Sequence, residues 1–315
     1  MSQPASTASS SSSASSFRGI WPALLTPLDA ELRIDHARFA SHSRALLEAG
    51  CGGVTPFGTT GEGPSFSLDE RRAAVDALVN GGVPASQIIV STSCAALPET
   101  LALTRHALAV GAHGCLMLPP FFLKGVSDQG IVDAYRYVID AAADDRLRLY
   151  LYHIPQVAGI GLSHHVIETL KTLYPQTIVG IKDSSCEIAH SRALAERFMR
   201  ELTVYVGNEL DLPELGRRGS TGAISGLANF MPRLVHRLVT QPDAPGTPQD
   251  LDRVTRVLAL LGGYALTPAL KGVMALLSGD KGWLRVRPPL VALSEPAFET
   301  LSAQLRAFGI GRESD

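Results

Sequence analysis

The chain alternates short apolar runs with longer segments of helical periodicity, and this alternation limits its possible folds more than any other feature. Strands separated by helices pair in parallel, because each helix carries the chain back along the sheet before the next strand begins. Eight units favour a closed (β/α)8 TIM barrel over a doubly wound sheet, which usually has fewer strands and a glycine-rich dinucleotide turn. The eight runs are 20–25, 53–57, 88–92, 114–118, 147–152, 178–182, 202–206 and 222–225.

The segments between these runs have apolar residues at every third or fourth position, as a helix with one buried face requires. Segments 35–49 and 68–79 show the pattern clearly. Ser67 and Glu70 have the spacing of a capping box, in which each side chain satisfies a free amide at the start of the helix. We therefore expect helices to follow the first two strands.

Three regions follow from the same patterns. Residues 17–232 hold the barrel units, and residues 233–315 continue as helices without strands, at 251–261, 268–277 and 296–307. Residues 1–16 are almost wholly Ser, Ala, Thr, Pro and Gln, a composition that buries too little surface to offset the entropy of ordering. We expect a disordered tail, a barrel and a C-terminal helical region.

Charge and cysteine content exclude several classes of protein. The formal net charge of -2 gives no reason to expect a nucleic acid as partner, because nucleic-acid binding normally shows as a basic face. Four dispersed cysteines without a CxxC pair do not form the disulfide framework of a secreted scaffold, which favours the cytoplasm. No run of about 18 uncharged apolar residues is present to span a membrane. We expect small-molecule partners, with neither nucleic acid nor membrane.

Lys182 ends the sixth apolar run, and active sites of such barrels lie at the C-terminal ends of the strands. Burial disfavours the ammonium form of a lysine and leaves more free amine to attack a carbonyl carbon. The alternative is a structural lysine paired with the adjacent Asp183, a common arrangement. The position alone leaves both interpretations open.

The segment from Gly58 through Thr59, Thr60 and Gly61 to Glu62 follows the second run. Two glycines let the backbone bend sharply, and consecutive amides can then bind an anion such as a carboxylate. The two hydroxyls could also relay a proton. An ordinary tight turn is the alternative, and a phosphate-binding P-loop is excluded because no Gly-Lys-Ser/Thr follows.

Tyr152 lies at the end of the fifth run and is followed by His153, Ile154 and Pro155. Its hydroxyl could point into the barrel mouth and act as acid and base, although a buried structural tyrosine has the same signature. His153 is equally consistent with packing. An amine, an anion cradle and a phenol at three different strand ends together predict imine chemistry on a 2-oxo acid.

These residues resemble the dihydrodipicolinate synthase and N-acetylneuraminate lyase family of pyruvate-dependent aldolases. The resemblance spans nearly everything after the tail. The matching motifs are Trp21-Pro22-Ala23, Thr26-Pro27, Gly58-Thr59-Thr60-Gly61-Glu62, Tyr152-His153-Ile154-Pro155, Gly180-Ile181-Lys182-Asp183 and Arg287-Pro288-Pro289-Leu290.

The resemblance implies the roles of individual residues. Lys182 forms the imine, Tyr152 shuttles protons with Thr59 beside it, and Gly58, Thr59 and Thr60 hold the carboxylate. Two further residues, Gly207 and Ile224, line the pocket. It also implies that no metal or dissociable cofactor takes part, that a 2-oxo acid and an aldehyde are the partners, and that the chain forms a homotetramer.

Three departures from the family pattern concern the substrate. Val157 stands where dihydrodipicolinate synthases usually have an arginine for the second substrate's carboxylate. Phe122 replaces a tyrosine that a neighbouring subunit usually supplies, and a phenyl ring cannot transfer a proton. Segment 91–94 lacks the glycine-rich sequence that frames the lysine feedback site. These residues support neither dihydrodipicolinate synthesis nor inhibition by lysine.

Residues 58–65, with Gly-Pro-Ser after the glutamate, look more like the 2-keto-3-deoxy sugar acid aldolases of the family. The leading hypothesis is a lyase that cleaves such an acid reversibly to pyruvate and an aldehyde. Two alternatives use the same imine: a keto-deoxy sugar acid dehydratase and a dihydrodipicolinate synthase. A non-catalytic 2-oxo acid binding protein is the alternative from another class.

Overall fold

The computed structural model describes residues 19–220 and 222–310, so the predicted tail at 1–16 lies outside the described residues. Seven parallel strands form one sheet in the order β1-β7-β6-β5-β4-β3-β2. They are β1 (Ile20–Pro22), β2 (Ile89–Ser91), β3 (Gly114–Met117), β4 (Leu149–His153), β5 (Ile178–Asp183), β6 (Thr203–Val206) and β7 (Ala223–Ser225).

The predicted second strand, 53–57, is shorter than expected but joins the two ends of this sheet. Val54 bridges Ile88 and Thr55 bridges Ala23, both in parallel. The segment is too short to be a regular strand because Phe57 turns into the left-handed region at φ 63°. A Cβ at Gly53 would lie 2.0 Å from the Trp21 ring, so the backbone passes directly against β1. With this eighth segment the sheet closes, and the predicted TIM barrel is confirmed.

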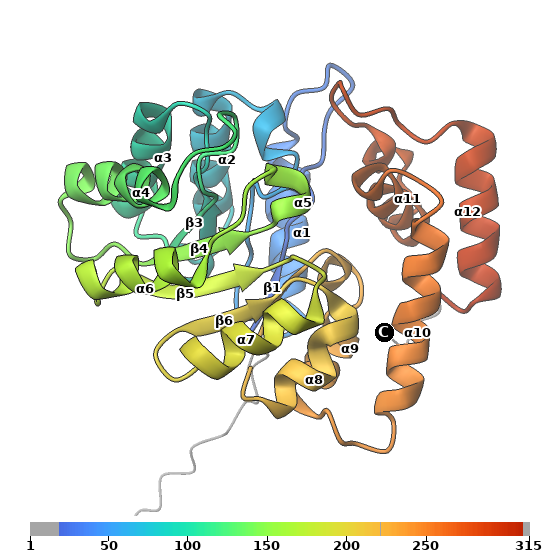
Figure 1. Ribbon diagram of the computed structural model, residues 1–315. Coiled ribbons are helices and arrows are strands. Elements are labelled where there is room, and N and C mark those ends of the chain that lie inside the picture. Colours follow the sequence, from blue (N-terminus) through green and yellow to red (C-terminus); the bar gives the residue numbers. More distant parts are fainter. Residues whose placement is uncertain (1–18, 221, 311–315) are drawn as a thin grey trace, which may run out of the picture.

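The helices lie on the outside of the curled sheet (Figure 1). The first two match the prediction: Asp35 caps α1, and the capping box of Ser67 and Glu70 starts α2. Helices around the barrel are α1 (His36–Glu48), α2 (Leu68–Asn80), α3 (Leu97–Ala109), α4 (Asp128–Ala142), α5 (Pro155–Ala158), α6 (His164–Leu173), α7 (Ile188–Phe198), α8 (Leu212–Arg217) and α9 (Pro232–Thr240).

Aromatic rings fill part of the barrel interior. The Tyr150 and Tyr205 ring centroids lie 5.5 Å apart, and Trp21 packs edge-on against Tyr205. Gly180 faces Tyr150 across the strands, and a Cβ there would lie 2.6 Å from that ring. Because side chains two residues apart share a face, Tyr152 occupies the next interior layer above Tyr150, toward the C-terminal ends of the strands.

Three helices follow the barrel: α10 (Thr247–Leu261), α11 (Leu266–Ser278) and α12 (Glu295–Ala307). Figure 1 shows them side by side along one flank of the barrel. Residues 267–275 of α11 are all buried. The predicted helices in this part of the chain are therefore present, while the boundary at residue 232 stays a prediction.

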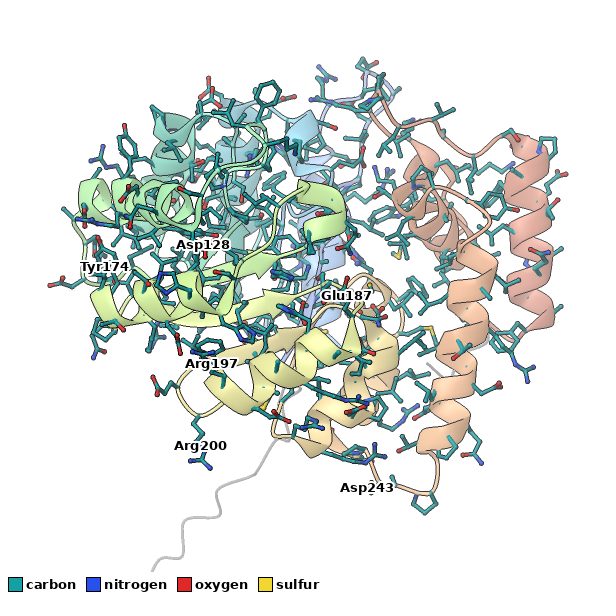
Figure 2. All side chains as sticks on the ribbon, in the orientation of Figure 1. Asp128, Tyr174, Glu187, Arg197, Arg200 and Asp243 are labelled. Carbon is teal, nitrogen blue, oxygen red and sulfur yellow. The ribbon has the colours of Figure 1, made fainter. Side chains whose placement is uncertain are left out.

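The outer surface is charged. Figure 2 shows Arg200 and Asp243 projecting away from the barrel, and both are exposed. Among the described helices, none alone is long and apolar enough to cross a membrane. Only α10 and α11 taken together pass that test, and they bend by 111° at their junction.

Candidate active site

Tyr152 and Lys182 form a neighbouring pair at the C-terminal ends of β4 and β5. The Lys182 Nζ donates a hydrogen bond to the Tyr152 hydroxyl at 3.2 Å and lies 4.3 Å from the centre of its ring. Lys182 is 5% exposed and Tyr152 2%. The strand alternation that turns both side chains inward turns their successors, His153 and Asp183, away from the cavity. The amine is therefore buried beside a neutral hydroxyl.

Thr59 extends this pair into a chain of three polar groups. Its hydroxyl lies 3.3 Å from the Tyr152 hydroxyl, within hydrogen-bond distance. Thr59, Tyr152 and Lys182 come from three separate segments of the chain, as predicted from the sequence. Such a chain can carry a proton between the cavity and the phenol.

The Thr59–Thr60 turn packs closely against the barrel, and glycines on its C-terminal side make this approach possible. A Cβ at Gly61 would lie 2.6 Å from the Leu24 carbonyl oxygen, and one at Gly63 would lie 1.9 Å from that of Phe57. The Thr26 hydroxyl donates to the Gly61 carbonyl at 2.8 Å. Only residues without a side chain allow this approach, which explains Gly61 and Gly63. A Cβ at Gly58 would meet nothing within 4 Å, so close packing does not explain that glycine.

A cavity of about 210 Å³ opens above these groups. Of the residues predicted for the site, six line it: Thr59, Thr60, Tyr152, Lys182, Gly207 and Ile224. Gly58 is not among the lining residues, although it begins the turn. Gly207 packs so closely that a Cβ would lie 1.9 Å from the Ser184 hydroxyl oxygen. The structure thus brings all but one of the predicted residues to one cavity.

Apart from Val157, which the sequence had placed at the second-substrate position, sequence reasoning missed a larger group of lining residues. Ser184 could have been found, because it follows Lys182 by two positions and so shares its face. The contribution of α10 and α11 has no local signal in the sequence. The remaining lining residues are Ala23, Ile154, Gln156, Val157, Ser184, Cys186, Glu209, Gly226, Leu227, Leu258, Leu266 and Leu270.

A buried ion pair ties the Thr59–Thr60 turn to α11. The side chains of Glu62, which ends the turn, and Lys271 are both fully buried and paired with each other. The Lys271 Nζ also donates to the Arg285 carbonyl at 2.7 Å, and the Arg287 amide donates to Glu62 at 3.1 Å. Burial lowers the pKa of Lys271, while the Glu62 carboxylate acts in the opposite direction. The C-terminal region therefore anchors the predicted anion cradle.

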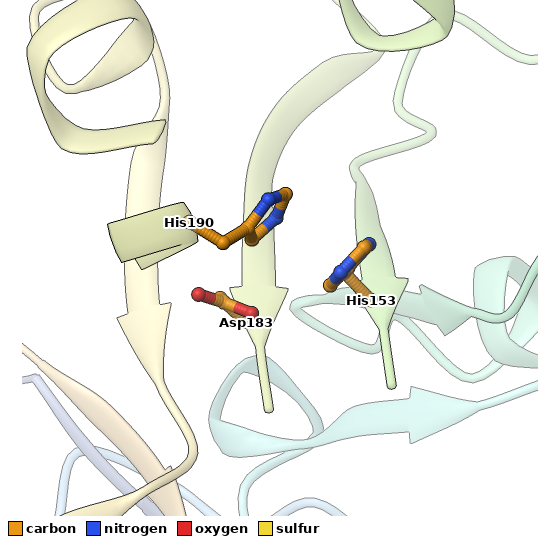
Figure 3. Close-up of side chains that lie close together, drawn as sticks. All are labelled: His153, Asp183 and His190. Atoms are coloured by element: carbon orange, nitrogen blue, oxygen red, sulfur yellow. The ribbon is translucent and has the colours of Figure 1, made fainter. Parts of the chain in front are cut away.

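The outward pair, His153 and Asp183, belongs to a second cluster behind the site (Figure 3). Asp183 accepts hydrogen bonds from the Ser191 hydroxyl at 2.5 Å and the Ser185 amide at 3.0 Å. No ion pair joins Lys182 to Asp183 within the part of the chain that the structure describes. Asp183 therefore organises the loop after β5, and the alternative of a Lys182–Asp183 pair does not fit the geometry.

His153, Asp183 and His190 each offer a ligand atom within 4.8 Å of the others, which raises the possibility of a metal ion. The His153 Nδ1 accepts a hydrogen bond from the Leu162 amide at 2.9 Å, so its Nε2 carries the proton of the neutral ring and has no free lone pair. Its ring also stacks on His190 at 4.2 Å and 16°, which keeps the in-plane lone pairs from converging. Burial, followed by the charge of His190, lowers the pKa of His153 to about 4. The arrangement fits stacked imidazole rings better than metal coordination.

Comparison with known proteins decides the family. The model of the dihydrodipicolinate synthetase family matches residues 16–308. The chain belongs to this family. An uncharacterized DapA-like lyase of Chloroflexus aurantiacus is 32% identical over 288 residues, covering 91% of this chain and 95% of that protein.

Superposition on solved structures is consistent with this family assignment. The crystal structure of dihydrodipicolinate synthase from Agrobacterium tumefaciens C58 superposes with a TM-score of 0.86 at 31% identity, covering 92% of this chain and 99% of that one. A variant of the 2-keto-3-deoxygluconate aldolase of Sulfolobus solfataricus has a TM-score of 0.82 at 19% identity, with 92% and 96% covered, and shows likeness of fold. The protein is accordingly an enzyme of the lyase class.

Proposed function

We propose that this lyase cleaves a 2-keto-3-deoxy sugar acid reversibly to pyruvate and an aldehyde through an imine on Lys182. One observation carries the proposal: the Lys182 amine is buried at 3.2 Å from the Tyr152 hydroxyl, which in turn lies 3.3 Å from Thr59. Among the described residues no carboxylate is paired with the Lys182 Nζ, which lines the cavity where a carbonyl carbon can reach it.

The reaction begins when Lys182 Nζ attacks the C2 carbonyl to give a carbinolamine. Tyr152 gives its proton to the departing hydroxyl, so water leaves and the protonated imine remains beside a Tyr152 phenolate. Tyr152 takes the proton of the C4 hydroxyl, the C3–C4 bond breaks, and its electron pair moves into the imine to form an enamine. The aldehyde leaves. Proton return to C3 and addition of water then release pyruvate and the free amine. Thr59 hydrogen-bonds the Tyr152 hydroxyl and supports each proton transfer.

The substrate class is supported by what surrounds this chemistry. The Thr59–Thr60 turn offers backbone amides for the C1 carboxylate. Val157 lines the cavity where a dihydrodipicolinate synthase is expected to have arginine, so nothing at that position recognises a second carboxylate. A cavity of about 210 Å³ suits a short sugar acid.

The test is reduction of the protein with borohydride in the presence of pyruvate, followed by mass analysis of the intact chain and its peptides. We expect one adduct, on Lys182, which is lost in Lys182→Ala and kept in Lys271→Met. Folded protein without an adduct would remove the imine mechanism. Assay of a panel of 2-keto-3-deoxy acids then separates aldolase from dehydratase, because only the aldolase releases pyruvate and an aldehyde.

We also propose a homotetramer in the cytoplasm. Phe122 is 74% exposed beside an apolar cavity of about 390 Å³ that it lines with Pro119, Pro120 and Leu123. Apolar surface of this kind is typical of subunit contacts. All four cysteines are free, as a reducing compartment allows. Light scattering would test the assembly, and a monomer with full activity would overturn it.

A further inference from the structure

His153 and Asp183 directly follow the reactive pair, Tyr152 and Lys182, on neighbouring strands. The two lie opposite each other in the parallel register of β4 and β5, and the His153 carbonyl accepts a hydrogen bond from the Ser184 amide at 2.8 Å. Both side chains are buried, on the outer face of the barrel wall. The contacts that hold these two side chains therefore also hold the backbone that carries Tyr152 and Lys182.

The His153 ring is fixed by the segment that leads into α6. Its Nδ1 accepts a hydrogen bond from the Leu162 amide at 2.9 Å. A Cβ at Gly161 would lie 2.8 Å from the His153 Cε1, so the backbone of this segment lies directly against the ring. The next residue, Ser163, caps α6 with its side chain. His153 thus joins β4 to the start of α6.

The start of α7 packs against both outward side chains. The ring of His190, in the first turn of α7, stacks on the His153 ring with centroids 4.2 Å apart and planes at 16° (Figure 3). Ser191, the next residue, donates its hydroxyl to Asp183 at 2.5 Å. The starts of two helices therefore support β4 and β5 behind the reactive pair.

The hydrogen bonds of the Tyr152 hydroxyl leave little room for movement. It lies 3.2 Å from the Lys182 Nζ and 3.3 Å from the Thr59 hydroxyl. These distances are at or beyond the long end of the usual range for such bonds. A small further shift would separate the three groups, and misplacement of a reacting group by about 1 Å costs on the order of 100-fold in rate. The proton transfers of Tyr152 therefore depend on a well-fixed end of β4.

Only one protonation state of His153 supplies the acceptor for Leu162. The neutral ring with its proton on Nε2 has a lone pair at Nδ1. The protonated ring has two N–H donors and no acceptor, so it would present a donor to the Leu162 amide. A buried amide that loses its acceptor is destabilised. Protonation of His153 therefore breaks the link between β4 and α6.

Charged and titratable groups from three elements surround the His153 ring and its neighbour His164. They are Asp183 on β5, His190 and Arg197 on α7, and His164 and Glu168 on α6. Burial is the main reason that the pKa of His153 is lowered to about 4; His190 and His164 act in the same direction, and Asp183 opposes them. At neutral pH the acceptor is therefore present.

We infer that His153 is a positioning residue for Tyr152. By accepting the Leu162 amide it fixes the end of β4 so that the Tyr152 hydroxyl stays beside Lys182, and acid releases this link and slows the reaction. The inference rests on the proposed imine chemistry and adds to it a residue that touches no substrate. His153 does not line the catalytic cavity, so its effect is on kcat rather than on substrate binding.

Two variants of similar size separate the acceptor from the bulk of the side chain. His153→Asn can accept the Leu162 amide through its side-chain oxygen and has no titratable group, whereas His153→Leu has no acceptor. At neutral pH, kcat for pyruvate release should fall by about 10- to 100-fold in His153→Leu and stay near the wild-type value in His153→Asn. KM should change little in either, because the Thr59–Thr60 turn is untouched. Equal losses in the two variants, or an effect on KM alone, would overturn the positioning role.

The pH dependence of kcat is a second readout. Because the neutral ring is the active form, wild-type kcat should fall as the pH drops toward about 4, and the fall in His153→Asn should begin at lower pH. Circular dichroism at each pH restricts the comparison to folded protein. Identical falls in the two proteins would contradict the acceptor role.

Hydrogen–deuterium exchange of the wild-type protein gives an answer even where the variants do not fold. The peptide that contains the Leu162 amide should lose protection as the pH falls toward about 4, after correction for the intrinsic exchange rate, whereas peptides of α12 should not. Equal protection of Leu162 at both pH values overturns the inference.

Borohydride trapping with pyruvate in the same samples separates the two levels of failure. Absence of the adduct on Lys182 at neutral pH overturns the proposed function, and the role of His153 in it. An adduct together with constant protection of Leu162, or with equal losses in the two variants, overturns the positioning role and leaves the imine intact.

Discussion

Lys182 in β5 and Lys271 in α11 are both buried, yet one has a hydroxyl as its partner and the other a carboxylate. Lys182 donates to the hydroxyl of Tyr152, a neutral group. Lys271 is paired with the Glu62 carboxylate and donates to the Arg285 carbonyl, and both favour the ammonium form. Burial alone therefore does not make a lysine a nucleophile. Lys182 lines the cavity and has a hydroxyl as its partner, whereas Lys271 is fixed as one end of an ion pair and does not line the cavity.

The largest expected effect is the loss of activity on removal of the Lys182 amine, which has a hydroxyl as its partner. Lys182→Ala should lower kcat/KM for pyruvate release on the order of 10⁴-fold or more, because the covalent route is lost. Lys271→Met keeps the nucleophile and should still form the reduced adduct on Lys182. Steady-state kinetics and circular dichroism of both variants measure this. Trapping on Lys271 in place of Lys182 would reverse the comparison.

The next largest effect on kcat is expected at Tyr152, the hydrogen-bond partner of Lys182. Tyr152→Phe removes the hydroxyl and keeps the ring, so kcat should fall by about 10³-fold, within the range for a lost general acid–base group. The pyruvate adduct should still form, more slowly, since Lys182 remains buried. Single-turnover trapping separates the two steps. A variant with normal kcat would mean that Thr59 or water performs the proton transfer alone.

Breaking the ion pair between Glu62 and Lys271 should lower the free energy of unfolding more than it lowers the catalytic rate. Glu62→Gln leaves a buried ammonium without its carboxylate, and removal of one partner typically costs about 3 kcal/mol or more of unfolding free energy. Glu62→Gln combined with Lys271→Met should regain part of this, because no charge stays buried. Denaturant unfolding of the two single variants and the double variant gives the coupling.

A loss that is purely structural would leave the KM for pyruvate unchanged in protein that remains folded. We expect KM to rise in Glu62→Gln, because Glu62 ends the turn that holds Thr59 and Thr60. Strictly additive single-variant effects would contradict a direct pair between Glu62 and Lys271.

The residues around Lys182 were predictable from the sequence, whereas the partner of Glu62 was not. Lys182 and Tyr152 each end an apolar run and Thr59 follows one by two residues, so their convergence follows once the barrel is predicted. The partner of Glu62 was not predictable, because Lys271 lies in a helix whose pattern contains no sign of the turn it contacts. For the same reason the wall formed by Leu266 was missed. The strand at 53–57 was expected to be longer because its apolar composition does not reveal the left-handed turn at Phe57.

The smallest expected effect is on the stability that Glu70 contributes. Its carboxylate pairs with the Arg287 guanidinium, and the Arg287 amide donates to Glu62, the partner of Lys271. The Arg287 guanidinium lowers the pKa of the Glu70 carboxyl to about 2. A carboxyl whose pKa is lower in the folded than in the unfolded state stabilises the fold above its unfolded pKa, and this stability is lost as the pH falls through the folded value. Because Glu70 is partly exposed, solvent screens the pair, and Glu70→Gln should cost less than about 1 kcal/mol at pH 7.

Denaturant unfolding at a series of pH values checks this, with Glu31→Gln as the matched control in a more exposed pair with Arg33. The difference between wild type and Glu70→Gln should shrink as the pH falls from about 4.5 toward 2, whereas Glu31→Gln should show little difference at any pH. A difference that stays constant with pH would mean that the shape of Glu70, as the partner of Ser67 in the capping box, matters more than its charge. Since the Arg287 amide also holds Glu62, slower trapping on Lys182 in Glu70→Gln would show that the ion-paired region and the reactive region are coupled through Arg287.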